Sequence, residues 1–188
     1  MEIMIQSARA EQIQTLKNEL NTVSDAAKKL FAEHSNEQLM RRPSSGGWSA
    51  AECLAHLTMT GNKTMEAMEA ATANALRESL HSNAPYKLDF TGKLFLKILE
   101  PPVRFKAPAP PAFMPDAPAN GVAALEDFLK FQQRASKALD TASAISMVNV
   151  DVASPASAYI KYNLYSAFRI TAAHERRHIW QIEKALKG

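Results

Sequence analysis

The chain has 188 residues, of which 46% are hydrophobic and 22% charged, and its formal net charge is only +3. This length suits one domain with a full hydrophobic core, and we expect residues 1–188 to form a single helical domain. The basic residues are spread along the chain, so the charge does not indicate nucleic-acid binding.

The N-terminus and the cysteine content predict a cytoplasmic protein that does not interact with membranes. The first five residues are followed at once by polar ones, so we expect no secretion signal. No stretch approaches the roughly 18 apolar residues that a membrane span requires. The single cysteine, Cys53, excludes an internal disulfide and fits a reducing compartment.

Residues 7–33 are expected to form a long amphipathic helix. Apolar side chains recur there every three or four residues, which is the helical period. They are Ile13, Leu16, Leu20, Val23, Ala27, Leu30 and Phe31. Residues 39–47 then contain a proline, two serines and two glycines, which cannot continue a helix.

A second long helix is predicted to begin at a capping box and to run to about residue 80. Ser49 can accept a hydrogen bond from the backbone of Glu52, while the Glu52 side chain reaches back to Ser49. Glu52 is therefore first a cap and only a weak candidate for a catalytic carboxylate. His56 follows on a seam with Cys53 and Thr60. There it is either a hydrogen-bonded core histidine or a metal ligand, and Cys53 is more simply a buried, inert thiol.

Residues 81–120 form the longest interruption and hold most of the prolines. We expect a short helix over residues 90–99, where the apolar side chains share one face. Phe105, Phe113 and Met114 give the Pro-rich part apolar anchors. It is therefore expected to be a covering arm, with a stiff spacer as the alternative.

Residues 121–141 are expected to form the third long helix, with Val122, Leu125, Phe128, Leu129, Ala135 and Leu139 on its inner side. Residues 145–152 are rich in β-formers but isolated, so they are expected to be an extended linker. The last helix should run from about residue 156 to 187, just after Pro155. Four long helices without a credible sheet predict an all-α four-helix bundle with a long Pro-rich connection between its second and third helices.

The last helix carries the sequence His174-Glu175-Arg176-Arg177-His178. Two imidazoles four residues apart lie on one helix face and can hold the same ion. The pair belongs to the buried stripe, because steps of three and four residues lead through Ile160, Leu164, Ala167, Thr171, Ile182 and Ala185. Histidines in an apolar seam are costly to desolvate unless each is hydrogen-bonded or a divalent metal binds their lone pairs.

The same residues match the His-Glu-x-x-His pattern of zinc proteases, with Glu175 as general base. The third ligand of those enzymes normally lies downstream, and only ten residues follow His178, so we disfavour this interpretation. A third ligand is expected from earlier in the chain. His56 can supply it if the second and fourth helices are neighbours.

The segment Trp48-Ser49-x-x-Glu52-x-x-x-His56-Leu57, followed far downstream by His174-x-x-x-His178-x-x-Gln181-Ile182, resembles the DinB/YfiT superfamily of metal-binding four-helix bundles. The resemblance covers nearly the whole chain in helix order and spacing, and the Pro-rich 100–118 arm is similar to that of one branch. It implies that His56, His174 and His178 bind zinc, nickel or a similar divalent ion, usually in a homodimer. Some members are thiol S-transferases that use low-molecular-weight thiols, and others are described as metal-dependent hydrolases without a known substrate.

Three neutral imidazoles on a divalent metal leave a position open, as catalytic zinc sites do, and either a water or a thiol can occupy it. The first hypothesis is therefore a metal-dependent thiol transferase or hydrolase that acts on small molecules. Hydrolysis would need a base such as Glu52 or Glu175, and Glu175 lies about 100° around the helix from His174. The alternatives are a non-catalytic, metal-stabilised bundle with a binding or stress-related role, and a helical interaction module without a metal.

Overall fold

The computed structural model describes residues 2–81, 84–103 and 109–187, so the predicted anchor Phe105 lies outside the described residues. The described part is mostly helical, as predicted. Its helices are α1 (Glu2–Glu33), α2 (Asn36–Met40), α3 (Ala50–Arg77), α4 (Phe90–Leu99), α5 (Gly121–Ala142) and α6 (Leu164–Lys187). Two short 3-10 turns, η1 (Pro111–Phe113) and η2 (Met147–Asn149), and two strands, β1 (Asp151–Ser154) and β2 (Ser157–Asn163), complete it.

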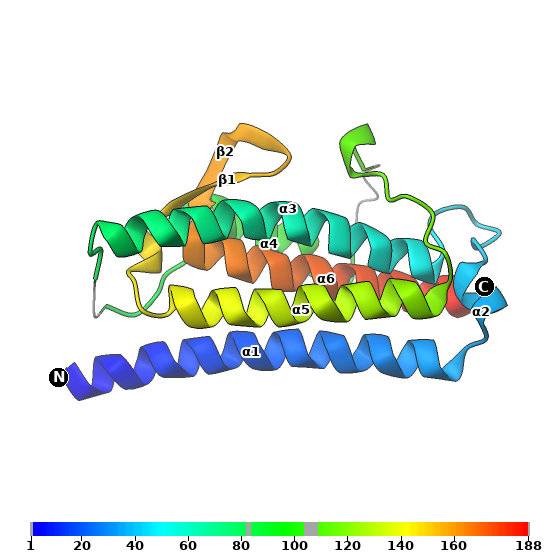
Figure 1. Cartoon of the computed structure of the whole chain (residues 1–188), viewed down its shortest axis with the longest axis horizontal. Coiled ribbons are helices and arrows are strands. Elements are labelled where there is room, and N and C mark those ends of the chain that lie inside the picture. The colour runs from blue at the N-terminus through cyan, green and yellow to red at the C-terminus, as the bar shows by residue number, and fades with distance from the viewer. Residues whose placement is uncertain (1, 82–83, 104–108, 188) are drawn as a thin grey trace.

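The four long helices α1, α3, α5 and α6 pack side by side (Figure 1). Helix α3 contacts both α5 and α6, and α1 contacts the same two helices from the other side. Each contributes large side chains to a common core, among them Leu16, Met65, Phe128 and Leu164. The neighbouring positions of α3 and α6 matter most, because these two helices carry the predicted histidines.

Helix α3 begins at the predicted capping box. The backbone N–H of Glu52 donates to Ser49 Oγ, and the Glu52 carboxylate accepts from the backbone N–H of Ser49. On α5, one predicted inward position is wrong, since Val122 is 65% exposed. It lies in the first turn of α5, where Gly121 rather than Val122 packs against Leu39.

The segment between α5 and α6 corrects the prediction of an extended linker and of a chain without a sheet. Strands β1 and β2 form an antiparallel hairpin in which Val152 pairs with Tyr162, and α6 begins only at Leu164. Ile160, assigned above to the helical stripe, lies in β2. Ile160 is itself β-branched and lies between the aromatic residues Tyr159 and Tyr162, and these residue types favour a strand over a helix. Asn163 ends the strand, and its side-chain oxygen accepts from the backbone N–H of Ser166 in the first turn of α6.

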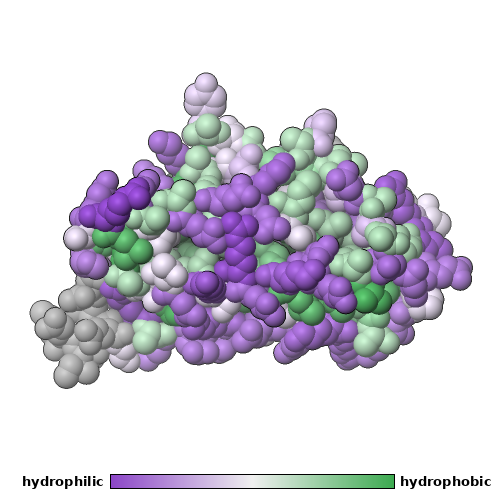
Figure 2. Space-filling model, in the orientation of Figure 1, coloured by the Kyte–Doolittle hydropathy of each residue, from purple (hydrophilic) through white to green (hydrophobic). Residues whose placement is uncertain are grey.

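Three segments lie along one side of the α3–α6 pair: α4, the arm around η1, and the turn of the β1–β2 hairpin. The hairpin and the arm project from the molecule beside α3 (Figure 1), and paler, more apolar residues gather there over a largely hydrophilic surface (Figure 2). Arg176 of α6 holds α4 in place through ion pairs with Glu100 and with Glu19 of α1. None of the helices in the described ranges combines the length and the apolar character needed to cross a lipid bilayer.

Candidate metal centre

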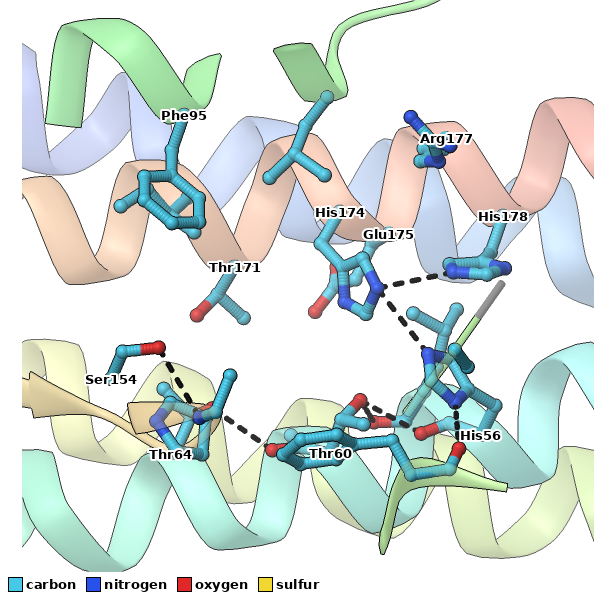
Figure 3. Close-up of a pocket in the computed structure, with 18 of the residues that line it drawn as sticks. His56, Thr60, Thr64, Phe95, Ser154, Thr171, His174, Glu175, Arg177 and His178 are labelled. Carbon is cyan, nitrogen blue, oxygen red and sulfur yellow. Dashed lines mark hydrogen bonds between the residues drawn. The ribbon is translucent and has the colours of Figure 1, made fainter. Parts of the chain in front are cut away.

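The three histidines singled out in the sequence meet between α3 and α6. His56 Nε2 lies 3.4 Å from His174 Nε2, and His178 Nε2 lies 3.1 Å from the same atom. Figure 3 shows His174 between the other two rings, with dashed lines joining the nitrogens. Packing of α3 on α6 therefore brings together residues that are 118 positions apart in the chain.

The spacing of these nitrogens fits a shared metal ion. All three ligand atoms lie within 4.8 Å of one another. Two nitrogens bound tetrahedrally to one zinc ion, each at 2.0–2.1 Å, would lie about 3.3 Å apart. The measured 3.1 and 3.4 Å agree with that separation. The donor set is three imidazoles, which suits zinc, nickel and similar ions.

The Pro-rich arm fixes the orientation of His56. Its Nδ1 lies 2.8 Å from the carbonyl oxygen of Phe113, and an N–H at Nδ1 donates to that oxygen. Nε2 is then left with its lone pair, which faces the other two histidines. Lys63 of α3 anchors the arm, since its Nζ donates to the carbonyl of Ala112 and lies over the Phe113 ring. The described part of the arm thus lines the site and supplies a hydrogen bond to a candidate ligand.

Burial keeps the three imidazoles neutral. It lowers the pKa of His56 and of His178, and it lowers the pKa of His174 to about 3, with the nearby His56 and Arg177 acting in the same direction. The Trp48 ring lies against the cluster, with its centroid 4.6 Å from that of His56 and 5.9 Å from that of His178. Three neutral rings whose Nε2 atoms converge offer three lone pairs to a single cation.

Glu52 and Cys53 stand apart from this cluster. The Glu52 carboxylate accepts hydrogen bonds from Arg42 and from the backbone of Ser49, and the Arg42 guanidinium lowers its pKa. Cys53 is fully buried, burial raises the pKa of its thiol, and it does not line the cavity described below. Among the described residues, the group that could hold a metal ion consists of the three histidines alone.

A cavity of about 630 Å³ opens beside the histidines. Its walls come from α3 and α6, and its cover comes from α4, the arm and the hairpin turn. Most of the lining is apolar and includes Leu57, Phe95, Phe131 and Ile170. Such a space, largely apolar with polar groups at a few points, is typical of a small-molecule site.

Glu175 is the residue of the site whose surroundings the sequence did not predict. It is 1% exposed, lines the cavity, and accepts a hydrogen bond from Gln132 of α5 at one carboxyl oxygen. The other oxygen, Oε1, has no hydrogen-bond partner among the described residues, and burial raises the pKa of the group to about 8. The signal was present in the sequence, because steps of three and four residues through the buried Phe168, Ala172, Ile179 and Ile182 pass through position 175.

Comparison with known proteins supports the resemblance noted from the motifs. The model of a family described as the DinB superfamily matches residues 19–182, which include all three histidines. No curated protein and no solved structure matches the chain.

Proposed function

We propose that this chain, which belongs to the DinB superfamily, binds one divalent metal ion through His56, His174 and His178 and acts with it as a thiol S-transferase on small molecules. The observation that carries the proposal is the convergence of three neutral imidazole nitrogens at the edge of a cavity of about 630 Å³. A purely structural ion would be enclosed by four protein ligands. Within the described residues the cluster has three, and it borders open space.

A divalent ion held there acts as a Lewis acid and lowers the pKa of a small acid, such as a thiol, that shares it. The residues of the chain supply the rest of the site. Phe113 holds the His56 ring through its carbonyl, and Trp48 shields two of the rings. The apolar walls favour substrates with an apolar body and exclude water from around the reacting groups.

Hydrolysis is the second candidate, and Glu175 favours it. Its carboxyl group lines the same cavity, and its raised pKa of about 8 suits a group that exchanges a proton near neutral pH. Glu52 does not serve this purpose, because Arg42 and Ser49 already occupy its oxygens.

Cobalt substitution tests the proposed site directly. Chelator-treated protein should bind one Co²⁺ per chain, with visible absorption bands typical of a site with nitrogen ligands. Adding a small thiol such as 2-mercaptoethanol should then produce a new charge-transfer band, because the thiolate reaches the ion. A cobalt spectrum that is unchanged by thiols would contradict the transferase, and failure to bind cobalt or zinc would contradict the metal site itself.

A screen of small thiols against electrophiles then tests catalysis. The zinc-loaded protein should accelerate consumption of the thiol, and the same protein with His174→Ala should not. Acceleration of ester or amide hydrolysis without a thiol would favour the second candidate. Tight metal binding without either activity would favour a metal-stabilised bundle with no catalytic role.

We also propose an architecture and an oligomeric state for the chain. We interpret the four packed helices α1, α3, α5 and α6 as a four-helix bundle that forms one DinB-like domain, with the Pro-rich segment connecting α3 to α5. A homodimer is the expected assembly, and light scattering coupled to size exclusion tests it.

A further inference from the structure

We infer that the cavity beside the histidines selects ligands that present an uncharged hydrogen-bond donor, an N–H or O–H group on an otherwise apolar body, to an acceptor surface formed by Thr60, Thr64, Thr171 and Glu175. The inference rests on the proposed function only in taking this cavity as the substrate site. It concerns the part of the cavity away from the metal ligands and names the class of substrate that fits there.

The three threonines can only accept hydrogen bonds from a ligand. Thr60 Oγ1 donates to the carbonyl of His56 at 2.7 Å, and Thr64 Oγ1 donates to the carbonyl of Thr60 at 2.9 Å. On the facing helix, Thr171 Oγ1 donates to the carbonyl of Ala167 at 3.0 Å. A hydroxyl has one proton, so each of these groups has only its oxygen lone pairs left for the cavity.

Glu175 adds a fourth acceptor, and it is the one that needs a partner. Oε2 accepts from Gln132, whereas Oε1 has no hydrogen-bond partner among the described residues although the side chain is 1% exposed. A carboxyl group retains acceptor capacity in either protonation state. Leaving a buried polar atom of this kind without a partner is costly, so a ligand that donates to it gains the corresponding free energy.

These acceptors form one surface on two facing helices. Thr60 and Thr64 are one turn apart on α3, and Thr171 and Glu175 are one turn apart on α6. Figure 3 shows the oxygens of Thr171 and Glu175 directed into the space between the helices, with Thr60 and Thr64 on the opposite wall. Because the helix rises 1.5 Å per residue, Thr60 lies about 6 Å along α3 from His56, so a ligand of ordinary size can reach both the acceptors and the metal position.

An uncharged donor fits this surface better than a cation does. The proposed metal ion is positively charged, and so is Arg177, which also lines the cavity. Both repel a cationic ligand. The remaining walls, including Phe95, Phe131 and Ile170, favour an apolar ligand body.

The test uses two probes that differ only in the donor. Indole carries one N–H group, 1-benzofuran has an oxygen at the same ring position, and neither is a good metal ligand. Binding of both to the zinc-loaded protein is measured by titration calorimetry or by ligand-observed NMR. We expect indole to bind at least about tenfold more tightly, because benzofuran would leave the buried acceptor without a hydrogen-bond donor. Equal binding of the two probes to the wild-type protein, or no binding of either, would overturn the inference.

Variants then locate the donor preference. One variant replaces Glu175 by Met, and a second replaces Thr60 and Thr171 together by Val. Both keep the size of the side chains while removing hydrogen-bond acceptors. At least one of these variants should lose most of the preference for indole. Thr72→Val is the matched control, since Thr72 is a buried threonine of α3 that makes the same bond to a preceding carbonyl but does not line the cavity. An indole preference that survives in both cavity variants would also overturn the inference.

Measuring the zinc content and circular dichroism of each sample keeps the two proposals separate. Absence of bound zinc in the wild-type protein contradicts the metal site but leaves the comparison of indole with benzofuran interpretable. Full zinc binding without a donor preference contradicts only the acceptor surface.

Discussion

Each of the two helices that carry the histidines also holds one buried carboxyl group, and the surroundings of these two groups are opposite. Glu52 lies one turn before His56 on α3, and its oxygens accept hydrogen bonds from Arg42 and the Ser49 backbone. Glu175 lies next to His174 on α6, and only one of its oxygens has a partner. The Arg42 guanidinium lowers the pKa of Glu52, whereas burial raises the pKa of Glu175 to about 8.

The difference separates a structural carboxylate from one available to a ligand. A carboxylate whose oxygens are satisfied by the protein stabilises the helix start and has little capacity left for other groups. A carboxyl group with one unmet oxygen in a cavity is destabilising until something binds it. Glu52 should therefore affect folding alone, and Glu175 should affect both folding and ligand binding.

The largest expected effect is the loss of metal binding when a histidine is removed. His174→Ala should reduce zinc affinity by more than about 100-fold, which is the upper end of the effect of losing an outer-shell partner. Competition with a chromophoric chelator measures it. His34→Ala is the control, because His34 lies outside the cluster and contacts the carbonyl of Leu30. Unchanged zinc binding by His174→Ala would exclude this residue as a ligand.

The second prediction concerns the pH dependence of stability in metal-free protein. Glu175 ionises near 4.5 in the unfolded chain and near 8 in the folded protein. The contribution of Glu175 to the free energy of unfolding is thus fully present below pH 4.5. It is lost as pH rises toward 8, by about 1.4 kcal/mol per pH unit. The histidines act in the opposite direction, because their lowered pKa values cost stability as pH falls below 6.5.

Glu175→Gln removes the loss of stability that ionisation of Glu175 causes as pH rises. Urea unfolding at pH 5, 6, 7 and 8 should show the variant becoming progressively more stable relative to the wild type as pH rises. Glu183→Gln, on the exposed side of α6, provides the matched control and should follow the wild-type profile. Parallel profiles for Glu175→Gln and the wild type would mean that Glu175 titrates as an exposed carboxyl does.

A smaller effect is expected from the arm that covers the histidines. Phe113→Ala removes the buried side chain that anchors η1 and so loosens the carbonyl that accepts from His56. Zinc affinity should fall by about tenfold, the lower end for an outer-shell partner. Met114→Ala, at the exposed neighbouring position, should leave the affinity unchanged. Equal effects of the two substitutions would show that the anchoring of the arm does not matter to the site.

Local signals in the sequence predicted much of this arrangement. The capping box at Ser49 and Glu52 depends on residues three apart, and the shared face of His174 and His178 on residues four apart, so both could be read directly. The family resemblance added His56, which periodicity alone left undecided, and the match over residues 19–182 bears out the family.

What the sequence did not predict depends on partners that are distant in the chain. The hydrogen bonding of Glu175 depends on Gln132, 43 residues away, and its burial depends on the packing of three helices. The orientation of His56 depends on a backbone carbonyl in the Pro-rich arm, and a backbone contact leaves no residue signature. The β1–β2 hairpin was missed because one short β-rich segment resembles a linker until its pairing partner is known.

The smallest predicted effect belongs to Glu52, and it tests the other half of the contrast. Glu52→Ala removes the reciprocal bond of the capping box and should lower the free energy of unfolding by about 1 kcal/mol, as loss of a helix cap does. Zinc affinity, measured as for His174→Ala, should not change, because the three residues between Glu52 and His56 remain helical. Ser49→Ala removes the other half of the same box and should cost a similar amount. A Glu52→Ala variant that stays stable but no longer binds zinc would show that this carboxylate supports the metal site after all, and that full hydrogen bonding does not mark a carboxylate as structural.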